Sequence, residues 1–141
     1  MTKKPKIVVI GSLIFDFVTS ADRLPKKGET VMGNSFGMFT GGKGSNQAVQ
    51  ACRLGAEVYM IGRIGNDFMG DKILSNLRND GVKTDFITKD KISSTAACCI
   101  HVDKNGDNAI IISQGANMTC TYQDIDNAKD IILSADIVLC Q

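Results

Sequence analysis

A glycine-rich bend followed by a polar helix start is the feature of this sequence with the clearest chemical potential. Residues 42–46 read Gly-Lys-Gly-Ser-Asn, and a helical pattern follows them. Glycine lets the backbone turn tightly, and the start of a helix offers backbone N–H groups to a polar ligand. Together with the Asn46 amide, these groups suit sugar hydroxyls or a developing oxyanion. The competing interpretation is a strand-to-helix turn that binds nothing.

Asp16 is the second candidate, because it lies at the end of the first predicted strand region. In open α/β sheets, ligands collect outside the carboxyl ends of the strands. A carboxylate at that place accepts hydrogen bonds from two neighbouring hydroxyls at once, which distinguishes a polyol from an apolar molecule. A helix cap or a solvated turn residue is the alternative interpretation of Asp16.

Two nucleotide-binding loops resemble the bend, and each fails at one residue. The run from Gly37 to Lys43 nearly matches the P-loop, but Gly44 stands where that loop needs Ser or Thr to hold Mg²⁺. The run from Gly42 begins like the dinucleotide fingerprint, but Gln47 replaces its third glycine and no acidic residue ends the next predicted strand. The sequence therefore favours neither a Walker-type site nor an NAD site.

The cysteines and the single histidine indicate neither a metal site nor nucleophilic catalysis. The five cysteines are an odd number and form no C-x-x-C pair, which favours reduced thiols over a disulfide framework or a zinc site. Alternation along a predicted strand places Cys98 and Ile100 on one face and His101 on the other. No pair of base and nucleophile is visible.

Length and composition predict one soluble globular domain. The chain has 141 residues, of which 43% are hydrophobic and 22% charged, and its net charge is +1. That charge offers no bulk attraction to nucleic acid or to an anionic membrane. The longest apolar runs are far shorter than the roughly 20 residues that a bilayer span needs. We expect no nucleic-acid or membrane partner and a cytoplasmic location, with the nucleus as the alternative.

Alternating strands and helices are the scaffold that must position these residues. Strands are predicted at 6–10, 57–61 and 136–140. Three helices are predicted, each with one face turned inward. The first follows the bend, and its inner residues are Ala48, Ala51 and Cys52. The second begins after Asn66 or Asp67 and ends at Gly81, with Gly70, Ile73, Leu74 and Leu77 inward, and the third begins after Thr121, with Ile125, Ala128 and Ile132 inward. This alternation predicts a parallel sheet with helices on its faces.

Two stretches break that alternation. Residues 30–39 and 95–113 read as β-ribbons, the second with an Asn-Gly turn, and predict a small antiparallel flap. The sequence also stops at Gln141, at the tip of an apolar strand with no covering helix after it. Because a parallel sheet needs cover on both faces, we expect the 141 residues to be part of a larger domain.

Taken together, these residues resemble the ribokinase-like (PfkB) carbohydrate kinase family along essentially the whole chain. The N-terminal signature of that family is a Gly-Gly turn, then Gly-x-Asn-x-Ala, then glycines after six and after nine further residues. This chain supplies Gly41-Gly42, Gly44 to Ala48, Gly55 and Gly65 at that spacing. Further likenesses in the order of the family are Gly11-Ser12 before Asp16, Leu24 to Thr30, Gly65 to Gly70, and Gly115 to Asn117.

The resemblance implies a three-layer α/β fold over residues 1–141, with helices on both faces of a parallel sheet and a small antiparallel β lid near 30–39 and 95–113. It implies no catalytic residue in this sequence, because the catalytic Asp of the family belongs to a Gly-Ala-Gly-Asp segment in the C-terminal half. The lid often forms the dimer contact in this family. The implied sugar-binding residues are Asp16, Gly42, Lys43, Gly44 and Asn46, with Cys98 and Ile100 of the lid above the sugar.

The implied activity is ATP-dependent phosphorylation of a sugar, first of all D-ribose at its 5-hydroxyl, with Mg²⁺ and a monovalent cation such as K⁺. We expect the 141-residue chain alone to be inactive, since the residues for ATP and cations lie beyond Gln141. Many family members carry Asn two residues before the sugar-binding Asp, and Ile14 stands there instead. Adenosine, fructose and other sugars therefore stay open. The second hypothesis is a non-catalytic module that binds sugar or dimerises through its lid.

Overall fold

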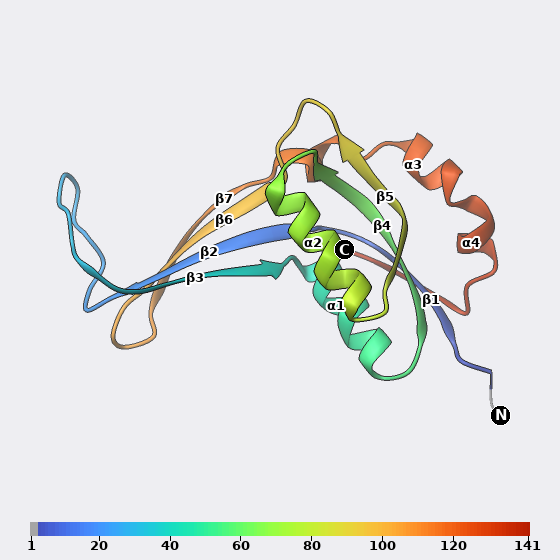
Figure 1. Ribbon diagram of the computed structural model, residues 1–141, viewed down its shortest axis with the longest axis horizontal. Helices are drawn as coiled ribbons and strands as arrows, with labels where there is room; N and C mark the ends of the chain where they lie inside the picture. The colour runs from blue at the N-terminus through green and yellow to red at the C-terminus, as the bar shows by residue number, and fades with distance from the viewer. Residues whose placement is uncertain (1–2) are drawn as a thin grey trace.

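The computed structural model describes residues 3–141 as two four-stranded β-sheets that meet at one end (Figure 1). Met1 and Thr2, the first residues of the expected domain, lie outside the described part. One sheet forms a core with four helices, and the other extends from it as a long ribbon, which we call the lid. The elements are β1 (Lys6–Ile10), β2 (Ile14–Ala21), β3 (Gly33–Gly41), α1 (Lys43–Arg53), β4 (Glu57–Gly65), α2 (Phe68–Asn79), β5 (Lys83–Asp90), β6 (Ala96–Val102), β7 (Asn108–Ser113), the 3₁₀ turn η1 (Gly115–Thr119), α3 (Tyr122–Asn127), α4 (Lys129–Leu133) and β8 (Ile137–Cys140).

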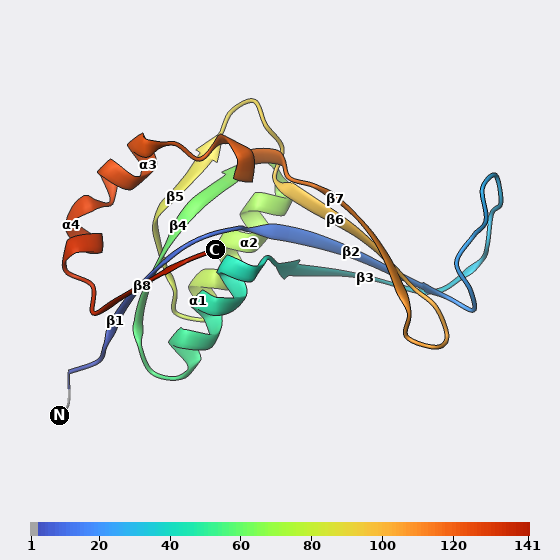
Figure 2. The same cartoon turned by 180° about the vertical axis from the view of Figure 1, so that it is seen from behind.

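The core sheet is parallel and is covered by helices on both faces, as the sequence predicts. Its strand order is β5-β4-β1-β8, and every neighbouring pair runs parallel. Val8 and Val9 point to opposite faces of β1, and both are fully buried. Val9 packs in the cluster beneath α1 and α2, whereas Val8 packs with Ala128 beneath α3 and α4. In both views the sheet lies between these two pairs of helices (Figures 1 and 2).

Helix α2 begins and ends where its sequence signals predict. The Asp67 carboxylate caps its first turn by accepting the Gly70 N–H at 2.9 Å. After the helix the chain turns at Gly81, whose φ of 86° favours glycine. The predicted inner stripe is buried against the sheet and consists of Gly70, Ile73, Leu74 and Leu77.

The lid differs from the antiparallel flap that the sequence predicts, because its central pair of strands is parallel. Its order is β3-β2-β6-β7, in which β2 pairs antiparallel with β3 and parallel with β6. Strand β2 was not predicted; it follows β1 after only three residues and places Asp16 within a strand rather than at the end of one. The chain passes directly from β1 of the core sheet into β2 of the lid. Strand β2 then pairs with β3 on one side and with β6 on the other.

Four features of the core also differ from expectation. The helix after Thr121 is split at Ala128 into α3 and α4. Strand β5 was not predicted, and β4 continues to Gly65 rather than ending at Ile61. Finally, β8 is largely exposed rather than buried, because within the described residues it pairs with β1 alone and stands at the edge of the sheet.

Polar contacts around Asp67 attach lid strand β6 to the core. The Asp67 carboxylate accepts the Thr95 N–H at 2.8 Å and the Thr95 hydroxyl at 2.7 Å, while that hydroxyl accepts the Gly65 N–H at 2.9 Å. Burial by itself would raise the pKa of Asp67, but the hydrogen bonds from Thr95 and Gly70 outweigh it and hold that pKa below its usual value. One carboxylate therefore caps α2 and holds the beginning of β6.

We expect Asp67→Ala to lower the free energy of unfolding by about 1–3 kcal/mol at pH 7, because the helix loses its cap and Thr95 loses its acceptor. A carboxyl with a lowered pKa in the folded state stabilises the protein above the unfolded-state pKa of about 4, and that contribution disappears as the pH falls through the folded-state value. Urea unfolding at pH 7 and pH 3 should therefore show a smaller difference between wild type and variant at pH 3. Ser75→Ala, at an exposed position on the same helix, is the control and should change stability by less than about 0.5 kcal/mol. Equal effects of the two variants would contradict the role of Asp67.

Candidate functional site

Strand β2 places Asp16 on the same face of the lid as Cys98 and Ile100. Asp16 lies opposite Cys98 in the β2–β6 register, and Val18 lies opposite Ile100. His101 is exposed on the other face, as the alternation predicts. Burial raises the pKa of the Asp16 carboxyl. Burial, and then the negative charge of Asp16, raises the pKa of the Cys98 thiol, which is 6% exposed.

The Asp16 carboxylate lies directly against the chain that enters the glycine bend. A Cβ atom built on Gly41 would be 2.4 Å from Asp16 Oδ2, so the carboxylate occupies space that a side chain at Gly41 would fill. Gly42 has a φ of 98°, and a Cβ there would be 2.6 Å from the carbonyl oxygen of Ser12. The structure thus brings Asp16 and the bend together, and Gly42 is required both by its φ and by its contacts with backbone atoms.

The first turn of α1 has two exposed polar residues and two buried small residues. Lys43 and Asn46 are exposed, whereas Gly44 and Ser45 are buried. The Ser45 N–H donates to the Ser12 carbonyl at 3.1 Å, which ties the helix start to the segment between β1 and β2. No side chain caps this helix, whose N-cap residue is Gly42. Its first turn therefore keeps the polarity that favours a hydroxyl or an anionic group.

Gly44 has a packing role that its residue type requires. A Cβ atom at this position would lie 2.6 Å from the Gly11 carbonyl carbon and 2.7 Å from the Ser12 nitrogen. Only glycine therefore allows α1 to approach the end of β1 this closely. A contact between Gly44 and a sugar stays a prediction. The same holds for sugar contacts of the other predicted residues, which are Gly42, Lys43, Asn46, Cys98 and Ile100.

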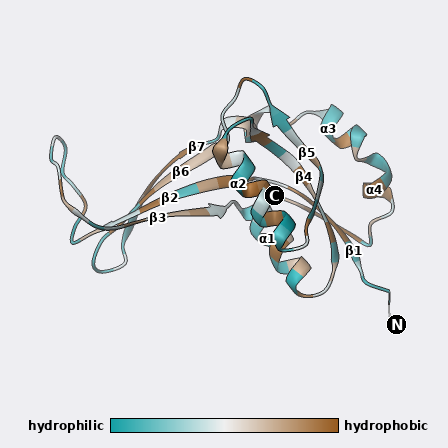
Figure 3. Ribbon diagram, in the orientation of Figure 1, coloured by the Kyte–Doolittle hydropathy of each residue, from teal (hydrophilic) through white to brown (hydrophobic). Residues whose placement is uncertain are grey.

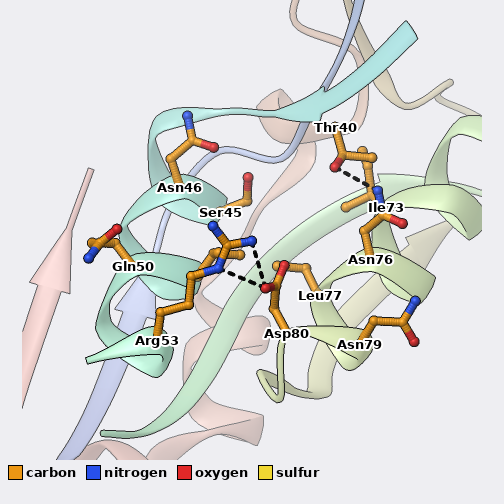
Figure 4. Close-up of a pocket in the computed structure, with 11 residues that line it drawn as sticks. Thr40, Ser45, Asn46, Gln50, Arg53, Ile73, Asn76, Leu77, Asn79 and Asp80 are labelled. Carbon is orange, nitrogen blue, oxygen red and sulfur yellow. Dashed lines mark hydrogen bonds and ion pairs between the residues drawn. The ribbon is translucent and has the colours of Figure 1, made fainter. Parts of the chain in front are cut away.

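A groove between α1 and α2 lies beside the bend and is separate from Asp16 (Figure 4). Its volume is about 540 Å³, and Asn46 is among its lining residues whereas Asp16 is not. An ion pair between Arg53 and Asp80 closes one end of it. In Figure 4 the Asn46 amide points away from that pair. The groove therefore lies next to the predicted sugar site, and Asn46 is the predicted sugar-binding side chain that also lines the groove.

A smaller hollow of about 270 Å³ lies at the carboxyl ends of β1 and β4. Ser12, Asn117 and Gln141 are among its lining residues, and the Ser12 hydroxyl donates to the Gln141 side-chain oxygen at 2.7 Å. Sequence reasoning assigned no function to Ser12 or Asn117. The Gly-Ala-Asn run at 115–117 was the available signal, but neither composition nor periodicity shows that it lies beside the segment before β2.

The described residues provide no evident metal site. Among residues 3–141, no group of three or more His, Cys, Asp or Glu side chains is placed to hold a metal ion. The same part of the chain contains no helix that is long and apolar enough to cross a bilayer.

Comparisons with known proteins give one consistent result. The family described as pfkB family carbohydrate kinase matches residues 4–141. A ribokinase of Bacillus subtilis is 45% identical over 136 residues, covering 96% of this chain and 46% of that protein, and a deoxyribokinase of Salmonella typhi is 36% identical over 135 residues, covering 96% and 44%. The structure of Arabidopsis thaliana ribokinase complexed with ribose and ATP matches with a TM-score of 0.89 at 34% identity, covering 99% of this chain and 46% of that one. The chain thus spans less than half the length of these relatives.

We expect Gly44→Ala to destabilise the protein by about 1–3 kcal/mol, because the added methyl group meets backbone atoms on a neighbouring segment that cannot move aside alone. Gln47→Ala, at an exposed position of the same helix, is the matched control. Thermal unfolding followed by circular dichroism measures the difference. A Gly44→Ala protein as stable as Gln47→Ala would contradict the close contact with Gly11 and Ser12.

Proposed function

This chain belongs to the pfkB family of carbohydrate kinases, and on that basis we propose that the complete protein transfers the terminal phosphoryl group of ATP to the 5-hydroxyl of D-ribose. The observation that carries the proposal is the similarity to proteins named ribokinase along 96% of the chain. Further support comes from the place where Asp16, Gly41 and Gly42 meet, since a carboxylate beside a helix start that no side chain caps suits a polyol.

In this proposal Asp16 accepts hydrogen bonds from two sugar hydroxyls, and the first turn of α1 with Asn46 donates to others. Cys98 and Ile100 lie on the Asp16 face of the lid and cover the apolar side of the ring. Closing the lid removes water from the site, which protects the phosphoryl donor from hydrolysis and strengthens the hydrogen bonds within it. The residues of this chain therefore bind and orient the sugar.

ATP, Mg²⁺ and K⁺ belong to the proposal for the complete protein. When bound, Mg²⁺ neutralises charge on the nucleotide phosphates. Within the described part of the chain, no group of three or more His, Cys, Asp or Glu side chains is placed to hold a metal ion. The sequence also contains no Gly-Ala-Gly-Asp segment. We therefore assign the base and the nucleotide site to other parts of the protein and propose that these 141 residues alone transfer no phosphoryl group. The proposed location is the cytoplasm.

A deoxy sugar is the second candidate substrate, and Ile14 favours it. Ile14 and Asp16 lie two residues apart on β2 and therefore share a face of the lid. The side chain of Ile14 offers no hydrogen bond to a hydroxyl, so a sugar that lacks one leaves no group there unpaired. The similarity to the deoxyribokinase of Salmonella typhi points in the same direction.

The lid is the proposed contact in a homodimer. It exposes apolar side chains on both faces, an arrangement more typical of an interaction surface than of a free one. Hydrophobic residues recur along its strands in Figure 3. On the Asp16 face Phe39 is 57% and Ile110 51% exposed, and on the opposite face Phe36 is 62% and Ile111 71% exposed.

The proposed activity is tested by incubating the complete protein with ATP and Mg²⁺ and with ribose, 2-deoxyribose, fructose or adenosine in turn. We expect the highest kcat/KM for one of the two pentoses, with the phosphate on O5. Ile14→Asn should raise the ratio of kcat/KM for ribose over deoxyribose about tenfold, because it adds a hydrogen-bonding partner. A preference for fructose or adenosine would contradict the proposed substrate, and sugar binding without any transfer would favour the non-catalytic module.

For the homodimer, analytical ultracentrifugation of the complete protein should show a dimer. A lysine placed in the buried patch is costly to desolvate, so Ile110→Lys or Ile111→Lys should produce monomers. Because these residues lie on opposite faces, the more disruptive variant identifies the face in contact. Tyr122→Lys adds the same charge at an exposed position on α3, away from the lid, and should stay dimeric. A dimer that tolerates both lid variants would disprove the lid contact.

A further inference from the structure

Three residues connect β1 to β2, and they determine where Asp16 lies. The last of them, Leu13, is fully buried, and its Cδ1 would be 3.1 Å from a Cβ built on Gly62 of β4. Its backbone groups pair with a side chain far away in the sequence. The Leu13 N–H donates to Asn117 Oδ1 at 3.1 Å, and Asn117 Nδ2 donates to the Leu13 carbonyl at 3.0 Å.

Asn117 lies on η1, the short turn that follows β7, and β7 is an edge strand of the lid. This turn is attached to the core and to the start of β6. The Ala116 N–H donates to the Ser94 carbonyl at 2.8 Å, and the Thr119 hydroxyl donates to Asp90 at 2.8 Å. A single amide therefore connects the beginning of the first lid strand to the chain that leaves the last one.

The chemistry of this pairing is specific to an amide of this length. The asparagine side chain offers a donor and an acceptor in one plane, whereas aspartate lacks the donor and alanine lacks both. Leu13 is buried, so its N–H and carbonyl would each lose a partner in a variant without the amide. Because Asp16 follows three residues later on a continuous strand, a shift at Leu13 moves its carboxylate as well.

We propose that Asn117 is a positioning residue for Asp16: it fixes the backbone of Leu13 and thereby sets the carboxylate of β2 relative to the glycine bend. Each polar atom of its side chain is paired with the Leu13 backbone, and it is through this backbone that Asn117 acts on Asp16. This inference rests on the proposed function, in which Asp16 binds sugar hydroxyls. A displacement of about 1 Å in such a group costs up to about a hundredfold in rate.

The first experiment measures steady-state kinetics of the complete protein with ribose and deoxyribose. We expect Asn117→Ala to lower kcat/KM for the preferred sugar roughly ten- to a hundredfold, with KM for ATP within about twofold of wild type. Asn117→Asp has nearly the same size but presents an oxygen to the Leu13 carbonyl, so its kcat/KM for the preferred sugar should fall by a similar factor. This variant also tests the proposal if the alanine variant does not fold. Asn127→Ala removes an exposed amide on α3 and is the matched control. Unchanged sugar kinetics in both Asn117 variants would overturn the proposal.

A double-mutant cycle separates positioning from a general loss of stability. If Asn117 acts through Asp16, the double variant Asp16→Asn, Asn117→Ala should be no less active than Asp16→Asn alone. Multiplied effects of the two substitutions would overturn the proposal.

Hydrogen exchange gives a readout that needs no activity. In Asn117→Ala the backbone N–H groups of residues 13–17 should exchange faster than in wild type, while those of β4 stay protected. Unchanged exchange at 13–17 would overturn the proposal even if the protein phosphorylates a sugar. Conversely, faster exchange in a protein that phosphorylates neither pentose would refute the proposed function and leave the pairing of Asn117 with Leu13 established.

Discussion

Direct contact between two stretches of backbone, 11–14 and 41–44, is the constraint on which the rest of this structure depends. The first stretch carries the chain from the core sheet into the lid, and the second carries it from the lid into α1. Hypothetical Cβ atoms at Gly42 and Gly44 would each fall within 3 Å of backbone atoms in the first stretch. Glycine is therefore needed for packing at both positions, and the close approach places the Asp16 carboxylate beside the start of a helix.

Polar groups attach the lid to the core sheet, in addition to Leu13 and Phe15, which are buried in the same apolar cluster as the core strands. Asp67 holds the start of β6, and Asn117 holds the segment before β2. Asp90 accepts the backbone N–H groups of Ser93 and Ile92, which lower the pKa of its carboxyl to about 2, and it also pairs with Arg63. Among the described residues, no buried polar side-chain atom lacks a hydrogen-bond partner. A long ribbon with exposed faces thus keeps one direction because the groups at its base are fully paired.

The sequence predicts features that depend on neighbouring residues and misses those that depend on distant ones. The helix starts after Asp67 and Thr121 and the shared face of Cys98 and Ile100 follow from local spacing, and the structure contains all three. By contrast, β2 pairs in parallel with a strand about eighty residues later, and no local pattern shows that pairing. The exposure of β8 likewise follows from its place at the edge of the sheet.

The same distinction applies to the candidate site. Asp16 and the bend were each visible in the sequence because carboxylates and glycine runs are recognisable alone. Their contact through Gly41 arises only when β2 pairs with β3, and the pairing of Leu13 with Asn117 arises only when the chain after β7 returns to the segment before β2. The position of Asp16 also has a thermodynamic consequence, because this residue belongs to the lid whereas Lys43 and Asn46 belong to the core. A sugar that contacts both can gain its full binding energy only when lid and core have the right relative position. Recognition of the substrate and closure of the lid are therefore one linked equilibrium in the proposed enzyme, because a ligand favours the closed state only through contacts, such as that with Asp16, that the open state lacks.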